Sequence, residues 1–491
     1  MGGYLLGIDV GTSGAKIAVV SPEGKLFALE MISYNIIAKQ PGWAEQTPQD
    51  WWGAVILASH KLSPELLSSV SAIGVTGQMH SLVLLGEKDK PLRPAILWAD
   101  LRSSKEVVEL SCRLGEQFLK ERLKNPIFTG LTAPCLMWIK KNEPDVFKDI
   151  KRVLLPKDYI RLRLTGLAGT EYSDASATGL FDIERLDWAQ EALDCIGISP
   201  TVLPDLHNSM EYAGGLLEQP AKKLGLKKGI PVVFGGGDQP AAALGNGVIS
   251  PGDILLTVGT GGQLFSPILR SKGDERLRVH TFCHCMERIW YHMGATLCAG
   301  LSLKWLRNNF FADKSYSALD SIAQEIEAGS EGLIYLPYLI GERTPHMDPK
   351  ARGIFFGVSY NHGPGHFIRA ILEGVAYSFK DVIEIIRAIG DEPKDIILAG
   401  GGANSLVWRQ IIADVLETPI KLSSHVQGSA FGAAFMAGVG SGRVRGIKEG
   451  IKECVHYSDE IIEPDKKNSA IYRERFAKYK EIYSRTKELY S

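Results

Sequence analysis

The sequence predicts an α/β fold in which one large structural unit occurs twice, and three observations support this. Apolar runs with the composition of strands occur together with segments of helical periodicity. Residues 5–20 form two such runs around a Gly-Thr-Ser turn, and a similar pattern returns at 253–265, with its Gly-Thr 248 positions further on. Residues 395–416 combine a strand, a glycine turn and a helix. A shared Gly-Thr turn does not by itself establish a duplication, but a spacing of about half the chain suggests one.

The predicted strands share one sequence pattern, an apolar run that is followed by a glycine turn. In chain order they are expected at 5–20, 71–78, 231–238, 253–265 and 395–404, followed by helices at 405–416 and 466–490. The first and fourth of these segments are predicted to be hairpins. The last helix has charged residues along one edge, and no function is assigned to it. The spacing of the repeat divides the chain into domains at 1–247 and 248–491.

Composition and charge narrow the class of protein. With 491 residues, 45% of them hydrophobic and 23% charged, the chain is long enough for two large globular cores. Its 55 Lys and Arg against 56 Asp and Glu give a formal charge of −1, which argues against a general surface for nucleic acid or anionic membrane. If the protein binds a phosphate group, local residues rather than a general positive charge must therefore bind it.

The seven cysteines are scattered and contain no C-x-x-C pair, so neither a disulfide framework nor a zinc ribbon is predicted. The first residues lack the pattern of a secretory signal, and no apolar run approaches the roughly 20 residues that a membrane span needs. We therefore expect a cytoplasmic protein.

The glycine turns are candidate phosphate sites. Phosphate oxygens need backbone N–H groups brought close, and glycine both permits positive φ and removes the Cβ that would hold a ligand away. Each turn alone has an ordinary structural explanation, because such turns also close hairpins. No G-x-x-x-x-G-K-[ST] motif is present, and Gly400–Gly402 lacks the G-x-G-x-x-G order, which argues against a P-loop and a Rossmann dinucleotide site.

Two acids stand beside these glycines. Asp9 and Asp238 lie at the ends of apolar strands, where a carboxylate can hold Mg²⁺ through water or accept a proton from an alcohol. The alternative is that each only caps a turn, which is a common role of Asp.

A cluster of potential metal ligands has a different explanation. His280, Cys283, His284, Cys285 and His292 include ligand types that zinc uses. If residues 283–285 form a strand, however, the two cysteine side chains share one face and His284 points to the other. We therefore predict a strand here and no metal centre.

At this point the motifs resemble the FGGY family of carbohydrate kinases, from about Tyr4 to about Gly440. Residues 6–20 are similar to the first phosphate motif of that family, 252–265 to its second, 395–416 to its adenosine motif and 428–434 to its second connecting helix. The resemblance implies two ribonuclease-H-like domains, of the actin, hexokinase and Hsp70 type, around a central cleft that binds ATP and Mg²⁺.

The resemblance also implies roles for individual residues. Asp238 would be the catalytic base, and Asp9 would be a second catalytic acid group that orients Mg²⁺ through water. The nucleotide-binding positions would be Gly11, Thr12, Ser13, Gly259, Thr260, Gly261, Gly401, Gly402 and Asn404.

Within the family, Gly77–His80 and Pro94–Arg102 are similar to the xylulokinases. This similarity implies a ketopentose substrate, D-xylulose first, phosphorylated at its 5-hydroxyl, and suggests a homodimer. The sugar-binding residues would be Gln78, Met79, His80, Trp98, Asp100 and Gln239. Two positions depart from the family pattern: Cys135 replaces a usual Lys, and Gln239 stands where several xylulokinases have Asn.

The sequence-based mechanism is transfer of the γ-phosphoryl group of ATP to a sugar hydroxyl. An alcohol is a weak nucleophile, so a carboxylate that orients it and accepts its proton helps. We expect Asp238 to have an ordinary pKa near ~3.9 and to be ionised. The alternatives are a kinase for ribulose, another ketose or a polyol, a non-catalytic sugar sensor, and a chaperone-like ATPase of the same fold.

Overall fold

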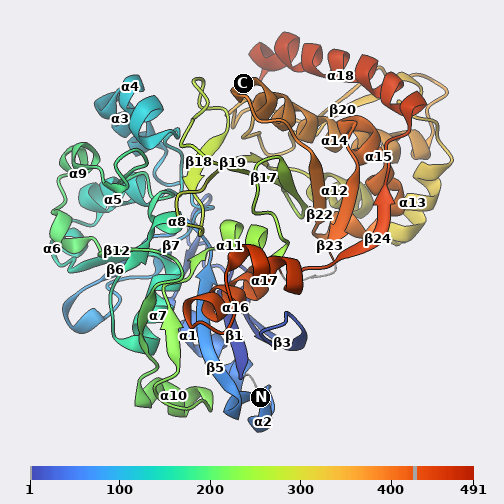
Figure 1. Cartoon of the computed structure of the whole chain (residues 1–491). Helices are drawn as coiled ribbons and strands as arrows, with labels where there is room; N and C mark the ends of the chain where they lie inside the picture. Colours follow the sequence, from blue (N-terminus) through green and yellow to red (C-terminus); the bar gives the residue numbers. More distant parts are fainter. Residues whose placement is uncertain (1–2, 424–427, 491) are drawn as a thin grey trace.

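The computed structural model describes residues 3–423 and 428–490 and shows two halves, each built around a mixed sheet (Figure 1). In the first half the strand order is β13 (Tyr212–Gly215), β14 (Pro231–Val233), β5 (Val70–Gly77), β1 (Tyr4–Val10), β2 (Gly14–Val20) and β3 (Leu26–Ser33), with β15 (Gly236–Gly237) beside β5. In the second half it is β18 (His280–Cys283), β19 (Trp290–Thr296), β17 (Gly262–Ile268), β16 (Asp253–Val258), β22 (Asp395–Ala399), β23 (Ile420–Ser423) and β24 (Tyr457–Ile462).

The two sheets repeat one pattern of neighbours. In the first half β1 pairs antiparallel with β2 and parallel with β5, and in the second half β16 pairs antiparallel with β17 and parallel with β22. Both predicted hairpins and the strand–turn–helix unit are therefore confirmed. The shared pairing agrees with the duplication that the spacing suggested. The predicted boundary between residues 247 and 248 falls after α11 (Asp238–Gly245) and before β16.

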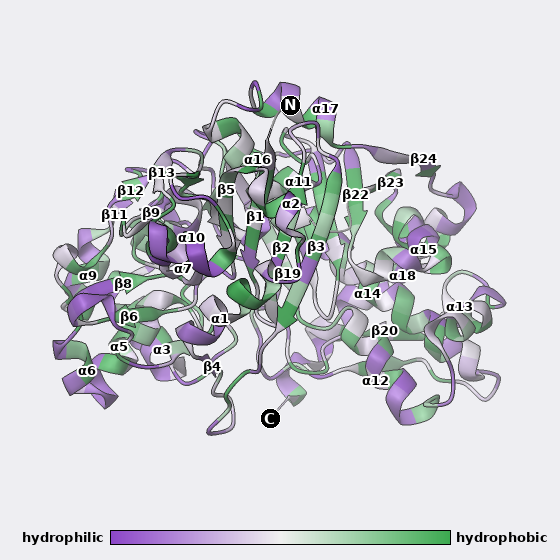
Figure 2. Ribbon diagram, turned by 90° about the horizontal axis from the view of Figure 1, so that it is seen from below, coloured by the Kyte–Doolittle hydropathy of each residue, from purple (hydrophilic) through white to green (hydrophobic). Residues whose placement is uncertain are grey.

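Helices cover the sheets on both sides. Figure 2 shows hydrophobic residues mainly along the central strands and hydrophilic ones on outer helices such as α10. The longer helices are α1 (Pro48–Ser59), α3 (Ser104–Leu114), α5 (Thr132–Asn142), α7 (Pro156–Thr165), α9 (Gln190–Ile196), α10 (Glu218–Leu224), α12 (Gly300–Phe310), α13 (Tyr316–Gln324), α14 (Pro364–Ile389), α15 (Leu406–Leu416), α16 (Gly428–Gly440), α17 (Ile447–Cys454) and α18 (Lys466–Thr486). Among the residues that the structure describes, no helix is both long and apolar enough to cross a membrane.

Helix α16 comes from late in the chain but packs on the first sheet. A Cβ on Gly7 of β1 would lie 1.9 Å from the carbonyl oxygen of Ala430, and one on Gly74 of β5 would lie 1.9 Å from that of Ala433. Glycine is therefore required at both strand positions because the helix backbone lies against them. This packing brings the start of α16 next to the carboxyl end of β1.

The remaining short elements connect these layers. They include the strands β4 (Glu45–Gln46), β6 (Val83–Leu85), β7 (Ala95–Ile96), β8 (Arg152–Leu154), β9 (Thr170–Glu171), β10 (Phe181–Asp182), β11 (Asp187–Trp188), β12 (Leu206–His207), β20 (Ile334–Leu336) and β21 (Ile354–Phe356), and the helices α2 (Pro64–Ser68), α4 (Glu116–Phe118), α6 (Pro144–Lys148) and α8 (Tyr172–Ala175).

One prediction of local structure is wrong. Strand β18 ends at Cys283, so His284 and Cys285 lie in the connection to β19 rather than on a strand. The reason is local: the Nδ1 atom of His284 lies 3.3 Å from the backbone nitrogen of Met286, within the turn that leads to β19. The strand alternation used for residues 283–285 therefore does not apply to them.

Candidate active site

The predicted site residues of the first half gather at one edge of its sheet. Strands β1, β5 and β15 are mutually parallel, so their carboxyl ends meet there. The turn of residues 11–13 follows β1, the sequence Gln78–His80 follows β5, and Asp238 follows β15. The carboxyl edge of parallel strands is where open α/β sheets bind their ligands.

The second half repeats this placement. Strands β16 and β22 are parallel neighbours, and the turn Gly259–Gly261 follows one while Gly400–Asn404 follows the other. Side chains connect the two edges: the Tyr291 hydroxyl of the second half lies 3.8 Å from the Met79 sulfur of the first. The sequence-predicted phosphate, adenosine and sugar residues therefore lie at two connected sheet edges.

Asp9 and Asp238 form an acid pair whose carboxyls repel. Asp9 is 5% exposed, and its Oδ2 accepts a hydrogen bond of 2.7 Å from the Ser429 hydroxyl of α16. Burial raises the pKa of Asp9, against the hydrogen bond from Ser429 and the charge of Lys16. Burial and the charge of Asp9 raise the pKa of Asp238 to about 7, although hydrogen bonds from Gln239 act against them. The expectation of an ordinary pKa near 3.9 for Asp238 is wrong, because the sequence shows neither the burial of this carboxyl nor the nearby charge of Asp9.

The first glycine turn is held by a polar network. The Thr12 hydroxyl donates to Gln78 Oε1 at 3.2 Å and accepts from Trp98 Nε1 at 2.9 Å, while Gln46 Nε2 donates to the Thr12 carbonyl at 2.8 Å. Ser13 at the tip of the turn is exposed and Gly11 is half-buried. Gln78 and Trp98 therefore fix the turn, in addition to any contact with a sugar.

The second glycine turn lies against the start of α12. The amides of Ala299 and Leu301 donate to the Thr260 carbonyl, each at 3.0 Å, and the Gly300 amide donates to the Gly259 carbonyl at 2.9 Å. A Cβ on Gly261 would lie 2.5 Å from the Thr296 carbonyl oxygen. The start of α12 and the Thr296 carbonyl therefore fix the backbone of the turn. The Thr260 side chain is exposed and accessible to a ligand.

The third turn adopts the short 3-10 helix η5 (Gly401–Asn404). Gly400 has φ of 85° and packs on Val258, whereas nothing lies within 4 Å of the place where a Cβ of Gly401 would be. Gly401 and Asn404 are exposed and Gly402 is half-buried. This turn leaves an open surface next to β16, where the predicted adenosine site lies.

His80 has a strained backbone and a lowered pKa. Its backbone φ is 69°, a left-handed conformation that a residue with a Cβ rarely adopts, and its carbonyl accepts from Thr132 Oγ1 at 2.9 Å. His80 Nδ1 lies 2.6 Å from the Ala177 carbonyl oxygen, and burial lowers the pKa of His80 to about 4. The neutral ring therefore carries its proton on Nδ1, because a carbonyl can only accept, and Nε2 keeps a lone pair for a hydroxyl donor.

Asp100 does not face a ligand. It is fully buried, its Oδ2 accepts from the Ala44 amide at 2.6 Å, and both of its oxygens are bonded by Arg102. These bonds fix the loop that carries Trp98. Asp100 therefore contributes to the site by stabilising the loop around Trp98.

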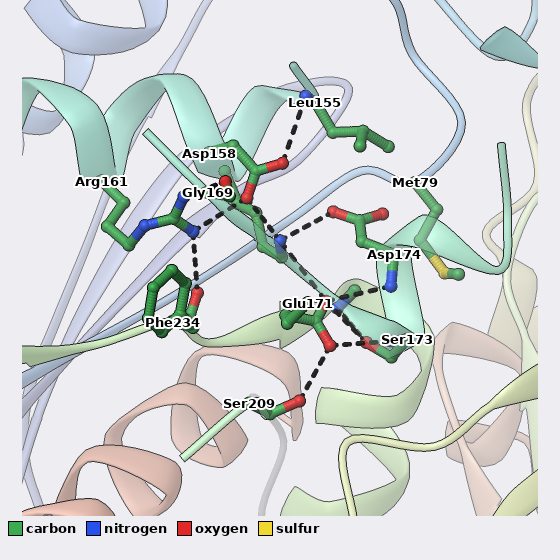
Figure 3. Close-up of polar contacts among 12 residues, drawn as sticks. Met79, Leu155, Asp158, Arg161, Gly169, Glu171, Ser173, Asp174, Ser209 and Phe234 are labelled. Atoms are coloured by element: carbon green, nitrogen blue, oxygen red, sulfur yellow. Dashed lines mark hydrogen bonds and ion pairs between the residues drawn. The ribbon is translucent and has the colours of Figure 1, made fainter. Parts of the chain in front are cut away.

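A buried ionic cluster behind Asp238 was not predicted from the sequence (Figure 3). Lys157 Nζ lies 2.7 Å from Asp158, 3.4 Å from Glu171 and 3.2 Å from Asp174, and all four side chains are fully buried. Arg161 bonds Asp158 and also donates to the Phe234 carbonyl at 3.3 Å. Burial raises the pKa of Asp174 well above its ordinary value. A protonated Asp174 is neutral, so the two remaining carboxylates balance the charges of Lys157 and Arg161.

The cluster reaches strand β15, which directly precedes Asp238. The Ser173 hydroxyl donates to Glu171 Oε1 at 2.9 Å and accepts from the Gly237 amide at 3.0 Å. With the Arg161 bond to Phe234, the cluster holds both ends of the segment 234–237 that leads into Asp238. The pairing of Lys157 with Glu171 and Asp174 is a contact that sequence spacing does not reveal.

Comparisons with known proteins agree with this geometry. The model of the N-terminal domain of the FGGY family of carbohydrate kinases matches residues 4–245, and that of the C-terminal domain matches residues 255–441. The xylulose kinase of Bacillus subtilis is 37% identical over 476 residues, which cover 96% of this chain and 95% of that protein. The gluconokinase of the same organism is 32% identical over 459 residues, covering 90% and 89%. A crystal structure of a xylulose kinase from Brucella ovis has a TM-score of 0.93 and 33% identity and covers 99% of this chain and all of that one.

Proposed function

The chain belongs to the FGGY family of carbohydrate kinases, and from this premise we propose that it transfers the γ-phosphoryl group of ATP to the 5-hydroxyl of D-xylulose. The products are D-xylulose 5-phosphate and ADP. Similarity to xylulose kinases over almost the whole chain supports this substrate. The observation that carries the proposal is the position of Asp238, which lies beside Asp9 and next to the segment 78–80.

Asp238 acts as the general base. Its carboxylate orients the sugar 5-hydroxyl and takes the proton as the oxygen bonds to phosphorus, which makes the alcohol a better nucleophile. A pKa of about 7 suits this role because a base titrating near neutral pH is about half ionised there and is a competent proton acceptor. Met79 packs against the strand that leads to Asp238, and His80 Nε2 accepts a hydrogen bond from another sugar hydroxyl.

The two glycine turns bind the phosphates. Backbone amides of Gly11–Ser13 and of Gly259–Gly261 donate to phosphate oxygens, with the hydroxyls of Thr12 and Thr260. Gly401, Gly402 and Asn404 hold the adenosine side. Transfer of a phosphoryl group needs mainly positioning and charge neutralisation, and these turns supply the positioning.

The acid pair fits a divalent cation. Asp9 Oδ1 is buried and has no hydrogen-bond partner among the described residues, and the charge of Asp9 acts on Asp238. An oxygen of this kind suits Mg²⁺, which binds through one or two carboxylates and keeps several waters. Asp9 would hold the ion through water, and a bound Mg²⁺ would neutralise charge on the ATP phosphates.

Gluconate is the competing substrate class, because a gluconokinase is also similar to most of this chain. A ribulose or polyol kinase differs from a xylulokinase only in how the pocket matches hydroxyls. The substrate therefore has to be measured.

The test is a coupled assay of ADP release with D-xylulose, L-xylulose, D-ribulose, L-ribulose, D-fructose, gluconate, glycerol and no sugar. We expect the highest kcat/KM with D-xylulose, and a loss of at least about 100-fold in Asp238→Asn, which removes the base. Preference for another sugar with the same loss would replace the substrate and keep the mechanism. Turnover that no sugar stimulates would contradict the proposal.

A further inference from the structure

We propose that Arg343 binds the phosphoryl group as it passes from ATP to the sugar, as a cation supplied by the second half of the molecule. The inference rests on the proposed kinase function. It assigns a catalytic contact to a residue that was not among the site residues predicted from the sequence.

The Arg343 guanidinium lacks the partner that a buried cation normally has. Among residues 3–423 and 428–490 it makes no ion pair and no side-chain hydrogen bond, although burial lowers its pKa and only the charge of Glu342 opposes that shift. A guanidinium has five N–H donors and no acceptor, and buried charges are normally paired. The Arg343 side chain is half-buried rather than fully enclosed, so a ligand can reach its guanidinium. The missing partner is therefore expected to come with the substrates.

The Arg343 loop is fixed beside the second glycine turn. Glu342 Oε1 accepts from the Leu297 amide at 2.9 Å, and the Thr344 amide donates to the Ala295 carbonyl at 3.0 Å. The residue between Ala295 and Leu297 is Thr296, whose carbonyl oxygen lies 2.5 Å from where a Cβ of Gly261 would be. These contacts place Arg343 next to the turn that binds a phosphate.

The guanidinium extends from this loop to the first half. Its central carbon lies 5.0 Å from the ring centre of Phe128 and 5.7 Å from that of Trp98. Trp98 Nε1 in turn lies 2.9 Å from the Thr12 hydroxyl of the first glycine turn. Aromatic rings orient a guanidinium through cation–π contact and leave its N–H groups for another partner. Arg343 therefore lies between the two phosphate turns, on the side where the sugar binds.

The groups around Arg343 favour an anionic ligand. His80 and His280 lie on the same side, and burial, with the charge of Arg343, lowers their pKa values to about 4 and about 3, so both are neutral. Both ring nitrogens of His280 are buried without a hydrogen-bond partner among the described residues. A neutral sugar brings no charge to balance the guanidinium. The phosphoryl group does, and phosphate oxygens accept charge-assisted bonds from Arg in a bidentate manner.

The chemistry defines what the contact does. The sugar oxygen forms a bond to the γ-phosphorus, the bond from that phosphorus to the ADP oxygen breaks, and the hydroxyl proton goes to Asp238. Negative charge is spread over the three equatorial oxygens during transfer, and an arginine directed at them lowers the barrier. After transfer the same oxygens belong to the sugar phosphate, so Arg343 also stabilises the bound product.

The experiment compares Arg343→Met and Arg343→Lys with Arg270→Met, a control on an exposed arginine of the same half. Calorimetry measures the Kd of D-xylulose and of D-xylulose 5-phosphate, and the assay measures kcat and KM. We expect Arg343→Met to lower kcat by about 100-fold or more and to weaken product binding by at least about tenfold. D-xylulose affinity should change less than about threefold. The lysine variant should keep part of both effects, because it retains charge without the bidentate fork.

Two results would overturn the inference. Unchanged kcat and product affinity in a folded Arg343→Met would show that the guanidinium does not contact the phosphoryl group. Equal loss of affinity for sugar and for sugar phosphate would show that it binds a sugar hydroxyl or carbonyl instead. A wild-type protein that phosphorylates no sugar would contradict the proposed function itself, which separates that failure from failure of the inference.

Discussion

Asp238 shows how one residue acquires its chemistry from contacts remote in the sequence. Its strand position was predicted from the local pattern of an apolar run and glycines, but its pKa depends on Asp9 and on burial. The same holds for His80, whose left-handed backbone and bond to Ala177 come from the fold. Residue identity and local pattern therefore predicted the candidate acids, while their protonation states required the structure.

The raised pKa of Asp238 predicts a stability effect that is independent of substrate. Between the unfolded pKa of about 4 and the folded pKa of about 7, the unfolded chain ionises this carboxyl while the folded protein keeps it protonated. Wild-type stability should therefore fall as pH rises through this window. Asp238→Asn removes the penalty, so the variant should be more stable than wild type at pH 8 in metal-free buffer.

Urea unfolding at pH 4, 6 and 8 measures this effect. The gain in Asp238→Asn should be largest at pH 8 and smallest at pH 4, where the folded carboxyl is protonated and the unfolded one is about half protonated. Glu30→Gln at an exposed ion pair is the control and should show no such dependence, because surface pairs contribute little. A constant difference between Asp238→Asn and wild type across pH would refute the raised pKa.

At the scale of elements, strand β15 depends on the buried ionic cluster that holds it. Ser173→Ala leaves the buried Gly237 amide without its acceptor, which costs about 1–3 kcal/mol. The strand end that carries Asp238 is then less well positioned. We expect kcat to fall by roughly tenfold and the acidic limb of its pH profile to shift, with KM for ATP unchanged.

Ser209→Ala is the matched control, because the Ser209 hydroxyl donates to the same Glu171 at 2.8 Å and, among the described residues, this hydroxyl has no bond to β15. The bond of the Gly235 amide to the Ser209 carbonyl is a backbone contact that the substitution keeps. It should lower stability by a similar amount and leave kcat and the pH profile unchanged. Ser173→Thr keeps the hydroxyl and should restore part of kcat. Equal kinetic effects of Ser173→Ala and Ser209→Ala would mean that the cluster only stabilises the fold.

The sequence predicted elements where local chemistry determines them. Hairpins at 5–20 and 253–265, the strand at 395–399 and the helices after it all follow from periodicity and glycine turns. It did not predict that α16 would pack on the first sheet, because the close contact of Ala430 with Gly7 joins distant segments. It did not find Ser173 or Arg343 for the same reason: each acts through residues far away in the chain.

At the scale of the whole molecule, two of the connections between the halves lie close to the proposed site. One is the packing of α11 with α16 on the first sheet, where a Cβ on Gly432 would lie 1.9 Å from the carbonyl oxygen of Ala241. The other is strand β18, the edge of the second sheet, which docks on the first half through Asn125 and Ser176. The proposed sugar site lies between these two connections. If the two halves close around the sugar, both connections must be kept.

Asn125 is the main polar link at the second connection. Its Nδ2 donates to the Thr281 carbonyl at 2.7 Å and its Oδ1 accepts from the Thr281 amide at 2.9 Å, so one side chain satisfies both backbone groups of a buried edge residue. Asn125→Ala leaves both groups unpaired, and each costs about 1–3 kcal/mol. Because the loss falls at a junction, we expect the two halves of the variant to unfold in separate calorimetric transitions and the wild type to unfold in one.

The same substitution should weaken sugar binding, because β18 carries His280, which packs against Phe128 in the first half at 5.0 Å between ring centres. ATP affinity should change little, since the adenosine turn follows β22, which β19, β17 and β16 separate from β18 in the second sheet. Asn309→Ala is the control: its Nδ2 donates at 2.8 Å to the Trp305 carbonyl on the exposed side of α12, within one half. If Asn125→Ala and Asn309→Ala both melt in a single transition and bind D-xylulose equally well, β18 does not couple the halves. Separate transitions with selective loss of sugar affinity would instead place the coupling of the two halves at this strand.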